Sequence, residues 1–171
     1  MQFLLILILA SVTTAETPEP GARAEPRSSK LQRSESLLVR AVLSGDSIDV
    51  ATRGRVHLLG ISAPAAKSNP GRDALGIRAR EKLANLVLQH WVRLEYESRS
   101  FGGGAGGAYL WREDGLFVNA VLVREGLARV NARRPLVRLD ELKRAEQEAR
   151  AARRGIWHDA PSEPLRGRLS D

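Results

Sequence analysis

The stretch that decides the fold is SGDSIDVATRGRVHLLGISAP, residues 44–64. It contains two short segments with the composition of β-strands, residues 47–51 and 55–61, joined by turn residues at 52–54. Residues 37–43, which are rich in aliphatic and β-branched side chains, precede them and add a third strand. Three short strands joined by tight turns predict an antiparallel meander.

The apolar spacing changes after this meander and predicts further elements of both kinds. We expect a helix at residues 73–88, strands at 91–97, 108–111 and 116–118, and helices at 119–127 and 138–154. This order predicts an α+β fold that is mainly β, a five-stranded OB-like Greek-key barrel with about three helices.

The N-terminus has the features of an export signal. Residues 3–12 form an apolar run that is too short to span a bilayer, which takes about 20 residues. Thr13-Thr14-Ala15 then supplies the small residues that a signal peptidase accepts. We therefore predict a cleaved signal peptide at residues 1–15, export to a periplasm or the exterior, and no stable membrane span.

Two further segments lack apolar periodicity and are rich in Pro, Ser and charged residues. Such segments bury too little apolar surface to order themselves. We expect a flexible linker at residues 16–36 and a disordered tail at 160–171, which leaves one folded domain at residues 37–159.

The composition limits the classes of function. The chain has 27 Lys or Arg against 20 Asp or Glu, a net charge of +7 and no cysteine. The absence of cysteine excludes disulfides, zinc–thiolate sites and thiol nucleophiles. The positive excess is spread over the domain, with +3 over residues 37–123 and +4 over residues 124–171. A spread excess favours a surface that attracts nucleic acid or another polyanion, without identifying the partner.

Several segments, in this order and spacing, resemble the staphylococcal nuclease (thermonuclease) family. Ser44-Gly45-Asp46-Ser47 matches the family's DGD[TS] turn. The later matches are Leu58-Leu59-Gly60-Ile61-x-Ala63-Pro64, Gly76-x-x-Ala79, Ala108-Tyr109-Leu110-Trp111, Asp114-Gly115-x-x-Val118-Asn119 and Gly155-Ile156-Trp157. The resemblance covers residues 37–158. It implies an OB-like barrel that, in active members, hydrolyses DNA or RNA phosphodiesters with Ca²⁺.

The resemblance also implies where catalytic residues would lie. In active members two aspartates and a glutamate supply the metal ligands and the general base, and two arginines hold the phosphate. These positions fall on Asp46, His57, Ser62, Ala65 and Ala105, so Asp46 alone keeps the family's residue type. Because Ca²⁺ takes about six to eight oxygen ligands, we expect little or no cleavage by the family mechanism. We expect no cofactor, and Ca²⁺ only if a residual metal site at Asp46 binds it.

Two groups of residues have alternative interpretations. Asp46 is either a residual metal ligand or a turn-forming aspartate that bonds to local backbone. Arg53, Arg55 and His57 would share one face of a regular strand, as a phosphate-binding stripe or as an ordinary solvated face. We favour the structural interpretation of both groups. The glycine run at residues 102–107 matches GxGxxG, but a strand follows it, so we reject a nucleotide-binding loop.

The favoured hypothesis is an exported, catalytically degenerate domain that binds nucleic acid or another polyanion. The alternative is an active Ca²⁺-dependent phosphodiester endonuclease with a rearranged site, in which Asp46 acts with Glu95 or Glu97. A third hypothesis is a structural or envelope-associated role with no polyanion ligand. The sequence carries no motif for a nucleophilic serine and does not predict the oligomeric state.

Overall fold

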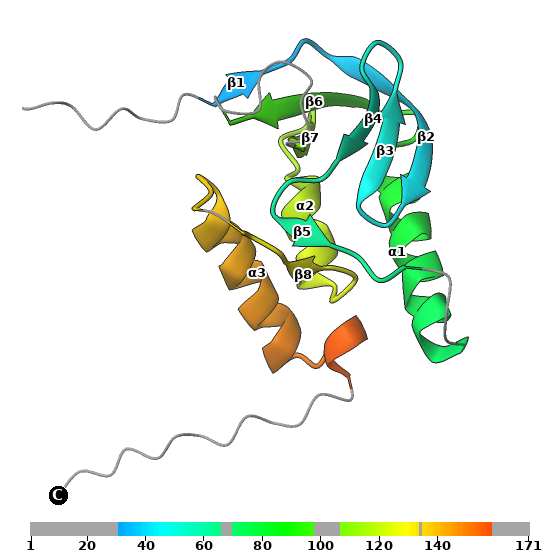
Figure 1. Ribbon diagram of the computed structural model, residues 1–171, viewed down its shortest axis with the longest axis vertical. Coiled ribbons are helices and arrows are strands. Elements are labelled where there is room, and N and C mark those ends of the chain that lie inside the picture. Colours follow the sequence, from blue (N-terminus) through cyan, green and yellow to red (C-terminus); the bar gives the residue numbers. More distant parts are fainter. Residues whose placement is uncertain (1–30, 66–69, 98–106, 134, 159–171) are drawn as a thin grey trace, which may run out of the picture.

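The computed structural model describes residues 31–65, 70–97, 107–133 and 135–158 (Figure 1). Within these ranges the strands are β1 (Gln32–Arg33), β2 (Leu37–Ser44), β3 (Ser47–Val50), β4 (Gly54–His57), β5 (Ile61–Ser62), β6 (Trp91–Tyr96), β7 (Tyr109–Arg112) and β8 (Arg129–Val130). The helices in the same ranges are α1 (Pro70–Val87), α2 (Val118–Arg124), α3 (Leu139–Ala151) and the short 3₁₀ helix η1 (Gly155–Trp157). The predicted signal peptide, most of the predicted linker and the predicted tail lie outside the described residues.

The described strands form a curled antiparallel sheet with the order β1-β6-β2-β3-β4, and β7 lies beside β6. β2, β3 and β4 make the predicted meander, in which Ile48 pairs with Val56. A separate short pair joins β5 to β8. Figure 1 shows the sheet at one end of the molecule with the helices below it. This arrangement confirms the predicted α+β, OB-like fold.

The core lies between the curled sheet and the helices. Alternation along β3 and β6 buries Ile48, Val50 and Leu94, while α1 contributes Leu83 and α3 contributes Leu142. Full burial of a side chain of this size contributes about 1.5–3 kcal/mol. None of the helices in the described part of the chain has both the length and the apolar character needed to cross a bilayer.

Strand β1 lies before residue 37, where we placed the start of the domain. β1 pairs with β6, with Gln32 opposite Tyr96 and Arg33 opposite Glu95. The next residue, Ser34, donates its backbone N–H to the Leu94 carbonyl and accepts the Leu94 N–H at its hydroxyl. Gln32, Arg33 and Ser34 therefore pair with β6, within the range that we predicted as a linker.

Two predicted strands have different bounds. The strand expected at residues 55–61 is interrupted at Gly60, whose φ of +79° turns the chain and separates β4 from β5. The strand expected at residues 116–118 is reduced to an isolated bridge between Phe117 and Trp111. The helix α2 starts directly afterwards, at Val118.

Candidate functional site

The β2–β3 turn lies tightly against its neighbours. Ser44 pairs with Ser47 across it, and Gly45 occupies the tip. A Cβ atom at Gly45 would lie 2.6 Å from the Ala79 Cβ of α1 and 2.7 Å from the Ala63 Cβ. Only glycine fits there, so α1 and the segment after β5 fix the position of Asp46, the next residue.

The Asp46 carboxylate accepts three hydrogen bonds from its surroundings. Oδ1 accepts from the Ser44 hydroxyl at 2.7 Å and lies 3.3 Å from the Ser47 hydroxyl. Oδ2 accepts the Ala63 backbone N–H at 3.0 Å. The Asp46 backbone carbonyl also accepts the Leu58 N–H at 2.8 Å. The geometry is that of an aspartate that joins the turn to the chain after β4, in agreement with the turn-forming interpretation.

His57 is linked to this turn through Ser47. The Ser47 hydroxyl is buried and lies 2.7 Å from His57 Nδ1, while the rest of the imidazole is exposed at the end of β4. The order Asp46, Ser47, His57 places the hydroxyl in the middle. A serine nucleophile needs the imidazole between the hydroxyl and the carboxylate, so this cluster is not a catalytic triad.

The predicted phosphate-binding stripe is only partly assembled. Arg55 and His57 share the exposed face of β4, because the intervening Val56 points into the core. Arg53 lies instead in the turn before β4, with its guanidinium 6.0 Å from the centroid of the Tyr96 ring. Arg55 and His57 therefore form the basic face of β4, and their contact with phosphate remains a prediction.

Of the remaining catalytic positions implied by the family resemblance, Ser62 and Ala65 are described. Ser62 lies in β5 opposite Arg129, and Ala65 is exposed shortly after it. Ala105 lies outside the described residues. The next described residue is Gly107, where a Cβ atom would lie 2.8 Å from the His57 carbonyl oxygen. The Ala108 N–H donates to that same oxygen at 2.9 Å.

The donor set at this turn does not suit Ca²⁺. Within the described ranges there is no group of three or more His, Asp or Glu side chains that could hold a metal ion. Asp46 offers one carboxylate whose two oxygens already accept hydrogen bonds from Ser44 and Ala63. A hard cation needs about six to eight oxygen ligands, usually several of them carboxylates. We therefore assign no catalytic step to a metal here.

Glu95, one candidate partner of Asp46, is engaged elsewhere. Its side chain is 2% exposed. Arg138 donates from Nε to Oε2 at 2.5 Å and from Nη2 to Oε1 at 3.1 Å, and Arg33 also donates to Oε1, at 2.9 Å. Burial alone would raise the pKa of Glu95, but the hydrogen bonds and charges of Arg138 and Arg33 outweigh it and lower the pKa below its usual value. The carboxylate is therefore ionised at neutral pH although it lies in the core.

Glu97, the other candidate partner, is also buried and accepts the Tyr109 hydroxyl at 2.8 Å and the Val137 backbone N–H at 2.7 Å. Burial and this hydrogen bond raise the pKa of Tyr109 well above its ordinary range, so the phenol remains the donor. These contacts hold Glu95 and Glu97 to Arg33, Arg138, Tyr109 and Val137, and the alternative in which either carboxylate acts with Asp46 stays a prediction. Arg138 lies 43 residues after Glu95, and Val137 lies 40 residues after Glu97. Local sequence patterns therefore carry no signal for these contacts.

Comparison with known proteins gives consistent matches. The family model described as "Staphylococcal nuclease homologue" matches residues 55–159. "Thermonuclease" from Staphylococcus intermedius is 33% identical over 159 residues, which cover 90% of this chain and 94% of that protein. "Micrococcal nuclease" from Shigella flexneri is 33% identical over 128 residues, with 69% of this chain and 71% of that protein covered. An "Uncharacterized endonuclease" from Escherichia coli is 32% identical over 129 residues, with 72% and 77% covered.

Proposed function

Because the chain belongs to the staphylococcal nuclease homologue family, we propose that it is an exported nucleic-acid-binding domain that lacks the calcium-dependent cleavage of active relatives. The observation that carries this proposal is the set of hydrogen bonds that the Asp46 carboxylate accepts. This carboxylate is the one family metal ligand that the resemblance retains, and it accepts hydrogen bonds from Ser44 and Ala63 that hold the turn together.

The substitutions at the catalytic positions are expected to slow phosphodiester cleavage by a large factor. Removing one well-placed donor to the developing negative charge typically lowers the rate by about 10²–10³, and removing a general base lowers it by about 10²–10⁴. By the resemblance, Ala65 stands in place of the base and His57 in place of one arginine. The two losses need not multiply, but each alone would reduce turnover severely.

Nucleic acid is the favoured ligand for two reasons. Relatives that match most of this chain are named nucleases, and nucleic acid is the substrate that such a name implies. The chain also carries a net charge of +7, and Arg55 and His57 form the basic face of β4 next to the β2–β3 turn. Binding through phosphate contacts needs positive charge but no metal or general base.

Export completes the proposal and is supported by the first fifteen residues alone. They carry no charged side chain, and small residues follow the apolar run. Mass spectrometry of the chain recovered from the periplasm or medium of a bacterial host is expected to give Glu16 as the first residue. Recovery in the cytoplasm with an intact N-terminus would contradict export.

A second candidate function is the active endonuclease, favoured by the nuclease names of the relatives. One experiment separates the two. The purified chain is incubated with single-stranded DNA or RNA in Ca²⁺, Mg²⁺ or EDTA, and cleavage and binding are measured on the same samples. We expect binding at low salt in all three conditions without cleavage. Metal-dependent cleavage that is absent in Asp46→Ala, with the variant shown to be folded, would establish the endonuclease instead.

A further inference from the structure

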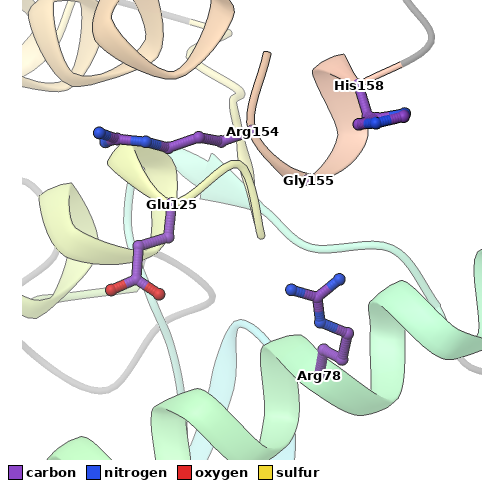
Figure 2. A pocket seen from close by; sticks show the side chains of 5 residues that line it. All are labelled: Arg78, Glu125, Arg154, Gly155 and His158. Carbon is purple, nitrogen blue, oxygen red and sulfur yellow. The ribbon is translucent and has the colours of Figure 1, made fainter. Parts of the chain in front are cut away.

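A pocket lies on the helical side of the molecule, apart from the β2–β3 turn. It has a volume of about 420 Å³ and is lined by Arg78, Glu125, Arg154, Gly155 and His158 (Figure 2). These residues come from α1, from the end of α2 and from η1 with its flanking residues. None of them is one of the catalytic positions that the family resemblance implies.

Gly155, which lines the pocket, packs closely against the backbone of Gly126. Gly126 has φ +68° and Gly155 has φ +52°. A Cβ atom at Gly126 would lie 2.0 Å from the Arg154 carbonyl oxygen, and one at Gly155 would lie 2.2 Å from the Gly126 carbonyl oxygen. The Ile156 N–H donates to that Gly126 oxygen at 2.9 Å. These contacts place the backbone of Arg154 and Gly155 directly against that of Glu125 and Gly126.

The charges around the pocket do not cancel. The single carboxylate, Glu125, is paired with Lys82 of α1, with Nζ 2.5 Å from Oε1. Arg154 donates a hydrogen bond from Nη1 to the Arg124 carbonyl at 3.2 Å. A carbonyl is neutral, so this contact does not neutralise the positive charge of Arg154. In Figure 2 the Arg78 side chain rises from α1 into the space between Glu125 and Gly155. No described residue makes an ion pair or hydrogen bond with the Arg78 guanidinium.

The size and lining of the pocket limit its ligand. Sites for small molecules have volumes of about 300–1,000 Å³, so a volume near 420 Å³ accommodates more than a bare ion. Four of the five lining residues have charged or titratable side chains, which disfavours an apolar ligand. A guanidinium without a partner is suited to a phosphate group, because its planar donors match two phosphate oxygens.

We propose that this pocket binds the phosphate group of a nucleotide-sized phosphate monoester, with Arg78 as the main contact. Two sources supply this chemistry, a free mononucleotide and the phosphorylated end of a nucleic acid chain. The inference does not depend on the proposed function, because the pocket shares no residue with the β2–β3 turn or with the basic face of β4. Mononucleotide binding can therefore succeed or fail whether or not the chain binds polymeric nucleic acid.

The test uses the full chain labelled with ¹⁵N and titrated with adenosine 5′-monophosphate, inorganic phosphate or adenosine. Short oligonucleotides with and without a 5′-phosphate form two further arms. We expect the monophosphate and inorganic phosphate to shift the amide resonance of Gly155, and adenosine to leave it unchanged. A shift by the 5′-phosphorylated oligonucleotide identifies a chain end as ligand, whereas its absence limits the ligand to free nucleotides.

The matched variants are Arg78→Ala, Arg78→Lys and Arg144→Ala. Arg78 and Arg144 are both exposed and both lie on helices, so the variants are expected to fold. Arg78→Ala should weaken monophosphate binding by about tenfold or more, because a charge-assisted hydrogen bond is lost. Arg78→Lys should retain part of the affinity, and Arg144→Ala should change it less than twofold. Equal affinity for adenosine and its monophosphate, or unchanged affinity in folded Arg78→Ala, would overturn the proposal.

Discussion

Glu95 holds together segments that are distant in sequence. Its carboxylate binds Arg33 of β1, 62 residues away, and Arg138, 43 residues away, which immediately precedes α3. The Arg138 guanidinium also lies 4.6 Å from the Trp111 ring centroid, and that ring stacks on Phe117 at 4.6 Å. One buried carboxylate thus joins β1, β6 and the residue before α3.

The variant Glu95→Gln should lower the free energy of unfolding by about 3 kcal/mol at pH 7, because removal of one partner leaves the Arg138 charge uncompensated. The folded-state pKa of Glu95 is lowered. Its contribution is therefore complete above the unfolded pKa of about 4.3 and is lost as the pH falls through the folded-state value. Urea unfolding at several pH values should show the difference from the parent shrinking below pH 4.

Glu148→Gln provides the control for that measurement. Glu148 pairs with Arg124 at 2.8 Å, but both side chains are about half exposed. An exposed ion pair contributes about 0–1 kcal/mol, so this substitution should change the stability little. A difference for Glu95→Gln that stays constant from pH 7 to pH 3 would show that the ionised pair is not its cause.

Asp46 has an expected effect on stability that differs from its expected effect on ligand binding. Asp46→Ala removes the acceptor of the Ser44 hydroxyl and of the Ala63 N–H, which are both partly buried. At about 0.5–1.5 kcal/mol net for each hydrogen bond, the two together contribute about 1–3 kcal/mol. We expect the free energy of unfolding to fall by that amount, while nucleic-acid affinity at low salt stays within twofold. Loss of affinity in a folded Asp46→Ala protein would assign Asp46 to the binding surface.

At the level of elements, the central strands and the helices could be predicted because burial on one face leaves a periodic apolar pattern. Ile48 and Val50 alternate with polar residues in β3, and both are fully buried. β1 could not be predicted this way. Gln32 and Arg33 are exposed, and their strand pairing depends on Glu95 far along the chain.

The candidate site also has a part that could be predicted from the sequence and a part that could not. The turn around Asp46 could be located from sequence, because Ser44-Gly45-Asp46 is a local turn signal and Gly45 is required by close packing. The engagement of Glu95 and Glu97 could not, because a buried carboxylate in a strand looks the same in sequence whether it faces a site or an arginine. The pocket at Arg78 arises from three segments and also has no local pattern.

We predict that β1 stabilises the sheet. A chain that begins at residue 31 keeps β1, and a chain that begins at residue 37 loses its pairing with β6, the Ser34–Leu94 bonds and the Arg33–Glu95 pair. Net contributions of about 0.5–1.5 kcal/mol per hydrogen bond give an expected loss of about 2–4 kcal/mol in urea unfolding. The chain that begins at residue 31 should match the full chain, and equal stability of the two truncated chains would mean that β1 does not stabilise the sheet.

For the whole molecule, the relevant quantity is the distribution of charge. The excess is +3 over residues 37–123, which carry most of the sheet, and +4 over residues 124–171, which carry α3 and η1. No single segment dominates. A distributed excess attracts a polyanion through many weak contacts and makes the affinity sensitive to salt.

The last prediction follows from this distribution. The logarithm of the affinity for single-stranded DNA should fall linearly with the logarithm of the salt concentration, by about 0.7 for each phosphate neutralised. If Arg55 on the basic face of β4 contacts a phosphate, Arg55→Ala should reduce the slope by about 0.7 and weaken binding to all sequences alike. Arg144→Ala, on the exposed side of α3, should leave the slope unchanged. A slope near zero would exclude electrostatic binding, and equal effects of both variants would mean that the long-range charge, and not the face of β4, attracts the polymer.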